Sequence, residues 1–199
     1  MTNMKEIYEQ TTKGPWTTEE STDTQYRITE TDDLITIDFQ GSCSGLDWLQ
    51  NFSFWKKPYK NMSKVFFVHA GFLKKYKAVR DVIHGVCRKS PGKDVMIRGY
   101  SQGAALAQLC YEDIWFNFPA SMAKGIGFGT PRVFGIWNFR ALNDRLEKFL
   151  RVENGNDIVC HLPPWLFLYK HYGTKKHVGS KRHWWKYSIK DHLTYEKNL

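Results

Sequence analysis

Short apolar runs recur along the chain and are separated by polar or glycine-rich stretches. Their lengths suit buried strands, and they cover residues 34–39, 64–69, 94–98, 124–129 and 148–153. Between them, apolar residues at helical spacing predict a helix over residues 72–89, with one face made by Phe72, Tyr76, Val79, Ile83 and Val86. Further helices are predicted from residue 104 to about 118 and from about 138 to 146.

The alternation of strands and helices predicts a single α/β domain over residues 1–199. This order favours a mostly parallel central sheet with helices on its faces. Residues 1–30 are interpreted as a polar N-terminal segment with weak helical character, and residues 184–188 as edge β structure. In such sheets function collects beyond the carboxyl ends of the strands, so we expect the site at the polar turns that follow residues 39, 98 and 153.

The turn after the run at 94–98 carries the strongest chemical signal. Gly-Tyr-Ser-Gln-Gly occupies residues 99–103, between a predicted strand and a helix that begins with small residues. A Gly-x-Ser-x-Gly turn in this context presents a nucleophilic serine on a strained backbone, and side chains at the two glycine positions would collide with the strand and the helix. The new helix also points its N–H groups at an anion formed beside the serine. Ser101 is therefore the candidate nucleophile; the alternative is a structural turn.

A serine nucleophile needs a base that takes its proton and an acid that orients the base. In α/β-hydrolases the three follow the order serine, acid, histidine. The best candidate acid is Asp157, in a polar turn after a predicted strand, although its carboxylate could serve that turn alone. Asp144 and Glu153 are rivals inside a predicted helix and a predicted strand. The best candidate base is His192; the other histidines after the serine are His161, His171, His177 and His183.

An oxyanion that forms on the attacked carbonyl needs preorganised N–H donors. One donor is expected from the backbone of Gln102, directly after the nucleophile. The other is expected from the turn after residues 34–39, where Ser42 offers its backbone N–H and its hydroxyl. The alternative for this turn is an ordinary polar connection.

Composition and charge narrow the class of protein. The chain has 199 residues, which is enough for one domain with a sizeable core. Its 16% of aromatic residues argues against a disordered chain. Its formal net charge of +9 favours anionic surfaces, and many of the positive charges lie in residues 170–183. No nucleic-acid-binding motif accompanies the charge, so no nucleic-acid partner is expected.

The remaining signals concern cofactors and location. Cys43, Cys87, Cys110 and Cys160 form no Cys-x-x-Cys pair and no zinc spacing with histidines, so free thiols are expected and no metal or organic cofactor is predicted. The first residues hold no secretory signal, and no run has the length of a transmembrane helix. On these grounds we expect a cytoplasmic protein, with release by lysis or another route left open.

Six blocks in a fixed order resemble the class 3 lipases, the fungal-type triacylglycerol lipase family, from about residue 33 to 195. Phe-Gln-Gly-Ser at 39–42 is similar to the family's oxyanion motif, and Val-His-Ala-Gly-Phe at 68–72 to its Val-His-x-Gly-Phe block. The turn at 99–104 and Phe-Gly-Thr-Pro-Arg-Val at 128–133 follow. Asn-Asp-Ile-Val at 156–159, with Leu-Pro-Pro at 162–164, resembles the acid motif. Asp-His-Leu-Thr-Tyr at 191–195 resembles the motif of the catalytic histidine.

The resemblance implies an α/β-hydrolase fold and an acyl-enzyme mechanism. It implies Ser101, Asp157 and His192 as the triad, with Ser42 and Gln102 shaping the oxyanion hole, and it places His177 in a structural strand. It also implies a lid after the oxyanion residue, at residues 45–55, whose apolar face covers an acyl-binding groove. A short helix packed permanently on the core is the alternative. The lid residues expected to meet substrate are Leu46, Trp48, Leu49 and Phe52.

The chain departs from the family pattern near the nucleophile. Tyr100 stands where a histidine is usual, and Gln40 stands where an arginine is usual. No catalytic group is removed, so an enzyme that cleaves fatty-acyl or glycerolipid esters at an anionic membrane surface is the leading hypothesis. An esterase or thioesterase for soluble short-chain substrates is the second. A non-catalytic basic membrane-binding module on a hydrolase scaffold is the third, because a fold alone does not establish function.

Overall fold

A seven-stranded, mostly parallel sheet forms the centre of the protein in a computed structural model that describes residues 3–41, 54–60, 65–137, 139–181, 183 and 186–199. Its strand order is β1-β2-β3-β6-β7-β9-β11. The strands are β1 (Thr17–Glu19), β2 (Thr24–Glu30), β3 (Leu34–Phe39), β6 (Asp94–Tyr100), β7 (Ala123–Phe128), β9 (Phe149–Asn154) and β11 (Thr174–Val178). From β3 to β11 every neighbouring pair is parallel, while β1–β2 and β2–β3 are antiparallel. The predicted mostly parallel sheet is confirmed.

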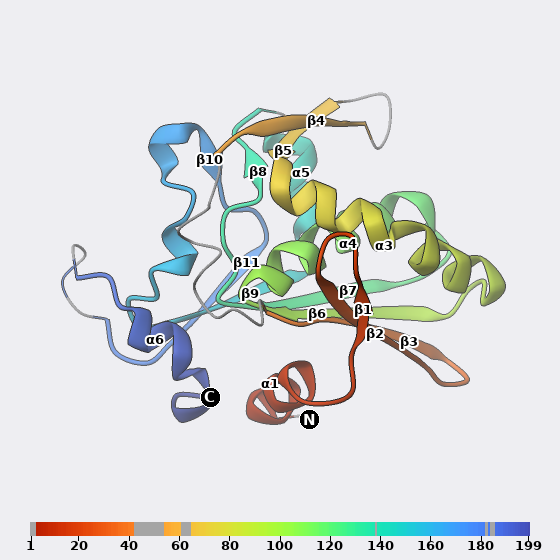
Figure 1. Cartoon of the computed structure of the whole chain (residues 1–199), viewed down its shortest axis with the longest axis horizontal. Helices are drawn as coiled ribbons and strands as arrows, with labels where there is room; N and C mark the ends of the chain where they lie inside the picture. Colours follow the sequence, from red (N-terminus) through yellow and green to blue (C-terminus); the bar gives the residue numbers. More distant parts are fainter. Residues whose placement is uncertain (1–2, 42–53, 61–64, 138, 182, 184–185) are drawn as a thin grey trace.

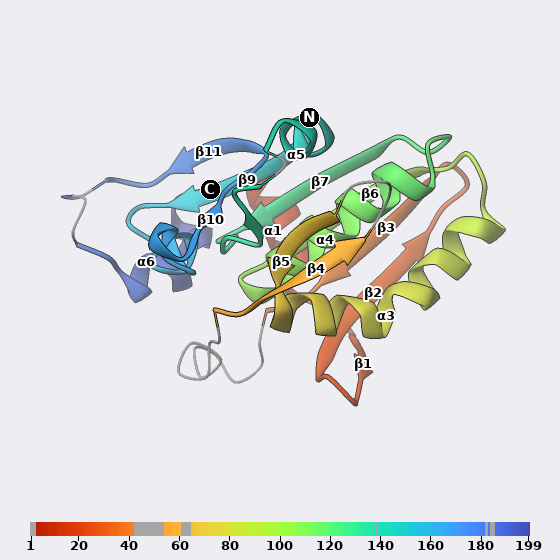
Figure 2. The same ribbon diagram turned by 90° about the horizontal axis from the view of Figure 1, so that it is seen from above.

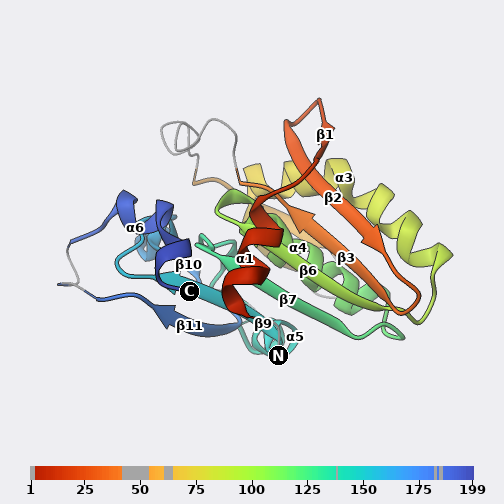
Figure 3. The ribbon, with the colours of Figure 1, turned by 90° about the horizontal axis from the view of Figure 1, so that it is seen from below.

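Helices cover both faces of this sheet (Figure 1). The helices α3 (Ala70–Lys89) and α4 (Gln102–Asn117) lie on one face, and α1 (Met4–Thr12) crosses the other (Figure 3). Shorter helices are α5 (Phe139–Leu146) and α6 (Ile189–Leu193), with the 3-10 turns η1 (Val159–His161), η2 (Trp165–Phe167) and η3 (Tyr195–Lys197). The helices predicted at 72–89, 104–118 and 138–146 are therefore present.

A second, antiparallel sheet of four short strands lies beyond α3 and α4 (Figure 2). Its order is β10-β8-β5-β4, with β4 (Lys56–Lys60), β5 (Val65–His69), β8 (Phe134–Gly135) and β10 (Tyr169–Lys170). The run at 64–69 does form a strand, but it was expected in the central sheet and belongs to this small one. Apolar content marks a run as a strand and leaves the choice of neighbours to the tertiary structure.

Two expectations at the ends of the chain are corrected. Residues 1–30, interpreted as a weakly helical polar segment, do hold the helix α1, but they also hold the strands β1 and β2, which were not expected. The strand β2 was missed because only its alternate positions are buried, and its outward residues are polar. At the other end, Ser188 makes a single parallel bridge with Asp157 where edge β structure was expected, while Trp184 and Trp185 lie outside the described residues.

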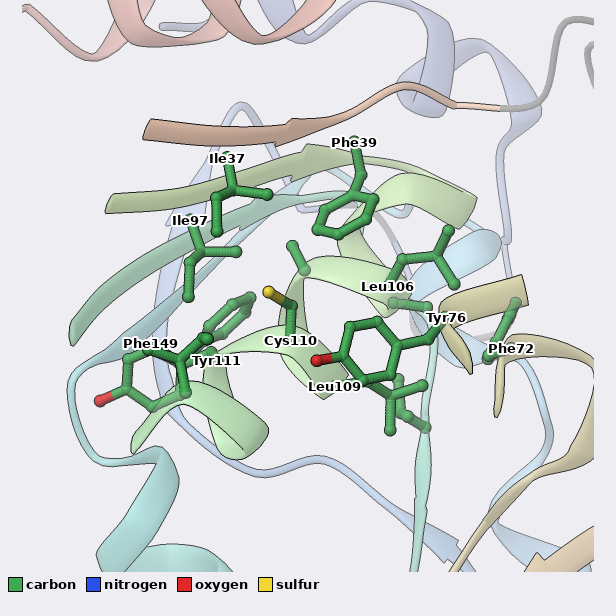
Figure 4. Packing of buried hydrophobic residues seen from close by; sticks show 14 of the residues in the cluster. Ile37, Phe39, Phe72, Tyr76, Ile97, Leu106, Leu109, Cys110, Tyr111 and Phe149 are labelled. Atoms are coloured by element: carbon green, nitrogen blue, oxygen red, sulfur yellow. The ribbon is translucent and has the colours of Figure 1, made fainter. Parts of the chain in front are cut away.

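The main core fills the space between the central sheet and the helices α3 and α4 (Figure 4). Residues 103–114 of α4 are all buried, which is typical of a central helix enclosed on every side. Aromatic side chains from other elements close the layer, among them Phe39, Phe72, Tyr76 and Phe149. This packing fixes α4, and with it the turn that carries Ser101.

Free thiols were also expected. Within the described part of the chain, Cys87, Cys110 and Cys160 are buried free cysteines, and Cys43 lies outside it. No helix among the described residues is long and apolar enough to cross a membrane.

Candidate active site

The predicted nucleophile turn joins β6 to α4 at Ser101. Its backbone has φ 56° and ψ −124°, a conformation that residues with a side chain rarely adopt. A Cβ at Gly103 would stand 2.2 Å from the carbonyl oxygen of Phe39, and one at Gly99 would stand 2.3 Å from the carbonyl oxygen of Gly103. Only glycine therefore lets β3, β6 and α4 approach closely enough to form this turn, as the sequence predicted.

The strain at Ser101 yields a prediction about stability. A Ser101→Gly variant is expected to be more stable than Ser101→Ala by about 1–3 kcal/mol, because glycine adopts this backbone conformation without a steric penalty. Equilibrium unfolding in urea measures the difference. Equal stability of the two variants would contradict a strained turn.

The structure brings the three predicted triad residues into one hydrogen-bonded row. The hydroxyl Oγ of Ser101 lies 2.8 Å from Nε2 of His192, and Nδ1 of the same ring lies 2.8 Å from Oδ2 of Asp157. All three residues are buried: 4% of Ser101, 1% of His192 and 2% of Asp157 is exposed. A neutral imidazole with its proton on Nδ1 donates to the carboxylate and accepts from the serine, the arrangement a general base requires.

The carboxylate of Asp157 serves both roles that the sequence left open. Its Oδ1 accepts a hydrogen bond of 2.8 Å from the backbone N–H of Val159, which stabilises the local turn. Its Oδ2 faces His192 and also accepts 2.7 Å from the hydroxyl of Tyr195. Burial, followed by the nearby Cys160 and Asp157, holds the pKa of Tyr195 well above its usual value, so this hydroxyl remains a neutral donor. The turn function and the orientation of the histidine are thus compatible.

His192 is held through the short helix α6. The hydroxyl of Ser188 caps this helix by accepting 3.0 Å from the backbone N–H of Asp191. The turn that carries Asp157 also bonds to Asp191. The backbone N–H of Asn156 donates a hydrogen bond of 2.8 Å to the Asp191 carboxylate, and the side chain of Asn154 donates one of 2.7 Å to the Asp191 carbonyl. The acid and the base therefore sit on two segments that are bonded to each other as well as to the nucleophile.

The rival acids and bases lie elsewhere. Asp144 is exposed on α5, and Glu153 is paired with Arg151 at 2.6 Å and with Lys175 at 3.2 Å. The remaining histidines are also placed away from the hydroxyl of Ser101: His171 lies 2.6 Å from the carbonyl of Cys160, His177 is in β11, His161 contacts Tyr187, and His183 is exposed.

Half of the predicted oxyanion hole lies in the described part of the chain. Gln102 is the first residue of α4, where an N–H group has no acceptor within its own helix. The turn after β3 comes close to the nucleophile, since a Cβ at Gly41 would stand 3.4 Å from Cβ of Ser101. Ser42 follows that glycine but lies outside the described residues, as do the expected lid residues Leu46, Trp48, Leu49 and Phe52.

An apolar pocket of about 590 Å³ lies where β4, β5, η2 and the chain after β8 meet. The lining residues are Phe54, Trp55, Lys56, Phe67, Trp137 and Phe167.

Comparison with known proteins identifies the family. The model of the family described as Lipase (class 3) matches residues 36–167. The chain belongs to this family. It is 28% identical to a lipase of Rhizomucor miehei over 151 residues, which are 72% of this chain and 41% of that protein. It is 30% identical to phospholipase A(1) DAD1 of Arabidopsis thaliana over 149 residues, 65% of this chain and 33% of the relative. This class 3 lipase chain thus matches a third to two fifths of these relatives' length.

Solved structures agree with the α/β-hydrolase fold predicted for this lipase-family chain. A lipase from Rhizopus microsporus var. chinensis superimposes with a TM-score of 0.76 at 25% identity, over 91% of this chain and 72% of that one. A triacylglycerol lipase whose catalytic centre is described as a serine protease triad gives 0.70 at 26% identity, over 83% and 64%. The predicted family and fold class are confirmed.

Sequence reasoning missed several side chains of this lipase-family site. The contact of Tyr195 with the acid could have been suspected from its place in the Asp-His-x-x-Tyr block, but Tyr8 gave no signal. Phe54 and Phe167, whose rings lie 4.4 Å apart in the pocket, come from distant parts of the chain. In the described part of the chain, no three His, Cys, Asp or Glu side chains gather as a metal site would need.

Proposed function

We propose that the chain is a serine hydrolase that cleaves carboxylic esters of fatty acids through an acyl-enzyme. The observation that carries the proposal is the pair of 2.8 Å hydrogen bonds that joins Ser101, His192 and Asp157. Membership in the class 3 lipase family and the lipase names of its relatives support the same reaction class.

The chemistry follows from the geometry. Ser101 Oγ attacks the ester carbonyl while its proton moves to Nε2 of His192, and the resulting oxyanion is stabilised by the N–H of Gln102 and by Ser42. The bond to the leaving alcohol then breaks as the imidazolium returns that proton to the alcohol oxygen. A water molecule, deprotonated by His192, attacks the acyl-enzyme, and the carboxylic acid leaves as Ser101 regains its proton. The carboxylate of Asp157 stabilises the imidazolium at both stages.

The pocket supports a fatty-acyl chain as the acid part of the substrate. Its lining is largely aromatic, and its volume lies in the range of small-molecule sites. Esters of glycerolipids fit this reading, in keeping with relatives named lipase and phospholipase A(1). A short-chain esterase or thioesterase would leave most of such a pocket empty.

Hydrolysis of p-nitrophenyl esters from acetate to palmitate tests the proposal. We expect the protein to hydrolyse these esters, with the highest kcat/KM on the longer acyl chains when detergent is present. A serine-directed phosphonate should abolish hydrolysis by adding covalently, once per protein molecule, to Ser101. A preference for acetate would favour the short-chain alternative. Absence of turnover by the folded protein on every ester would overturn the proposed activity and favour the binding-module reading.

We further propose that the protein docks on an anionic lipid surface beside the pocket. Apolar side chains stand exposed there, with 79% of Trp55, 72% of Trp165 and 70% of Leu166 accessible. Lys170 is exposed on β10, shortly after η2, and the net charge of +9 favours anionic headgroups. Single exposed apolar residues are ordinary, but a group around a pocket mouth indicates an interaction surface.

Sedimentation with phosphatidylcholine vesicles, with and without phosphatidylglycerol, tests this docking. We expect binding that rises with the anionic lipid and falls with salt. A Trp165→Ser/Leu166→Ser variant should bind at least about tenfold more weakly, since each side chain loses burial in the interface. The matched control is Val82→Ser/Met122→Ser, which alters two residues each about half exposed, at 50%, on other parts of the surface. Binding that depends neither on the content of anionic lipid nor on the salt concentration would contradict the proposal.

A further inference from the structure

The helix α1 lies outside the family-model match at residues 36–167, on the sheet face opposite α3 and α4 (Figure 3). Polar contacts fasten its C-terminal end. The guanidinium of Arg27 donates 2.6 Å to the carbonyl of Gln10 and 2.9 Å to that of Lys13, and Arg98 donates 2.7 Å to the Gln10 side chain. Cations at this end also suit the helix dipole. These contacts therefore fix the position of α1 on the sheet.

In this position, α1 places the ring of Tyr8 among aromatic residues that pack against the candidate site. The ring lies edge-on to Tyr100 at 5.6 Å between centroids and edge-on to Phe128 at 5.1 Å. It stacks on Tyr195 at 6.0 Å with an interplanar angle of 21°. Edge-on and offset-stacked aromatic pairs are stabilising beyond the area that they bury. Tyr8 thus holds both tyrosines at once.

These two tyrosines in turn hold the base and the acid. The ring of Tyr100 stacks on the imidazole of His192, with centroids 5.0 Å apart and planes within 16°, and its hydroxyl donates 2.8 Å to the carbonyl of the same residue. Tyr195 donates 2.7 Å to Asp157 Oδ2 and accepts 3.1 Å from the backbone N–H of Asn154. Rotation of the imidazole would break its contacts with the serine and the acid together. The stacked ring opposes that rotation.

We propose that Tyr8 is a positioning residue of the catalytic centre, so that the docking of α1 sets the orientation of His192 and Asp157 through Tyr100 and Tyr195. The inference rests on the proposed function for its kinetic consequence only. A small displacement of a catalytic group raises the barrier of the chemical step while leaving substrate binding unchanged. Loss of the ring should therefore act on kcat.

The test compares Tyr8→Leu, which keeps an apolar side chain without a ring, with Tyr8→Phe, which keeps the ring. With p-nitrophenyl butyrate in solution we expect Tyr8→Leu to lower kcat about tenfold with KM unchanged, and Tyr8→Phe to stay within twofold of the parent. Tyr8→Met is a second variant without the ring. Ile7→Ala is the matched control: it removes apolar contact between α1 and the same cluster while leaving every aromatic ring in place. It should lower Tm and leave kcat unchanged.

A proton NMR measurement tests the same inference without turnover. The Nδ1 proton shared by His192 and Asp157 should give a downfield resonance in the parent, Tyr8→Phe and Ile7→Ala proteins, and a broadened or missing one in Tyr8→Leu. An unchanged resonance in Tyr8→Leu, or a kcat equal to that of Tyr8→Phe, would overturn the proposal. Absence of any hydrolysis in the parent would instead contradict the proposed function, and the resonance would still decide the role of Tyr8.

Discussion

Ser101→Ala is expected to lower kcat for p-nitrophenyl esters by about 10⁴-fold or more. Its hydroxyl is the nucleophile in the proposed mechanism, and His192 cannot replace it with a solvent water at comparable efficiency. Because the members of a triad act as a unit, His192→Ala should fall to nearly the same residual rate as the serine variant, and the triple variant little further. Asp157→Asn should retain more activity than either single variant. Initial rates at saturating substrate measure the effect.

The control for this loss is Ser121→Ala, on the connection between α4 and β7 and away from the site. It should retain the parent's activity. A Ser101→Ala protein that is folded and still hydrolyses esters at more than about a hundredth of the parent rate would mean that the nucleophile lies elsewhere. The row of hydrogen bonds from Ser101 to Asp157 would then be structural only.

Asp113→Ala is expected to cause the largest loss of stability, about 3–4 kcal/mol. The carboxylate is buried on α4 and accepts hydrogen bonds from α3: 2.5 Å from Tyr76, 2.7 and 3.0 Å from Arg80, and 2.8 Å from His84. These donors lie four residues apart, on one face of α3. Removing the acceptor leaves Arg80, whose side chain is 29% exposed, without its ion-pair partner, and the buried His84 without its hydrogen-bond partner.

The same carboxylate predicts a pH dependence. Burial alone would raise the pKa of Asp113, but hydrogen bonds from His84, Arg80 and Tyr76 outweigh it and hold the pKa well below its ordinary value of 3.8. The unfolded chain therefore takes up this proton first as the pH falls. The contribution of Asp113 to stability is present above about pH 4 and is lost progressively below it. The parent should lose stability in this range more steeply than Asp113→Ala.

Equilibrium unfolding in urea at pH 7 measures the loss, and Asp81→Ala is the control. Asp81 is an exposed carboxylate on α3, so its removal should change the free energy of unfolding by less than about 0.5 kcal/mol. A change below about 1 kcal/mol in Asp113→Ala would show that the network between α3 and α4 contributes little net stability.

The local elements and the reaction class could be read from the sequence because short-range rules govern them. Apolar periodicity placed α3, β6, α4, β7 and β9 close to their observed bounds. The glycines at 99 and 103 follow from the local pattern alone, since a tight turn from strand to helix admits no side chain there. The order serine, acid, histidine narrowed the candidates, and the polar turn after a strand and the resemblance to the class 3 lipase motifs selected Asp157 and His192 from them. The oxyanion contribution of Ser42 and the lid stay predictions.

What the sequence left undecided depends on contacts between distant residues. The pattern of β5 is that of any apolar strand, and only its pairing with β4 and β8 placed it in the second sheet. The pocket joins Phe54 to Phe167, which are more than a hundred residues apart. Tyr8 sits in a segment without a motif, yet it contacts the tyrosines that hold the acid and the base.

Sequence by itself determined which groups could react, because the chemistry of a serine, a histidine and a carboxylate belongs to the residue types and to their place beyond the strand ends. Tertiary structure alone decided which side chains fix the orientation of those groups. Periodicity records that a residue is buried, and it carries no information about which partner it is buried against. The three tyrosines around His192 and Asp157 are therefore a property of the fold.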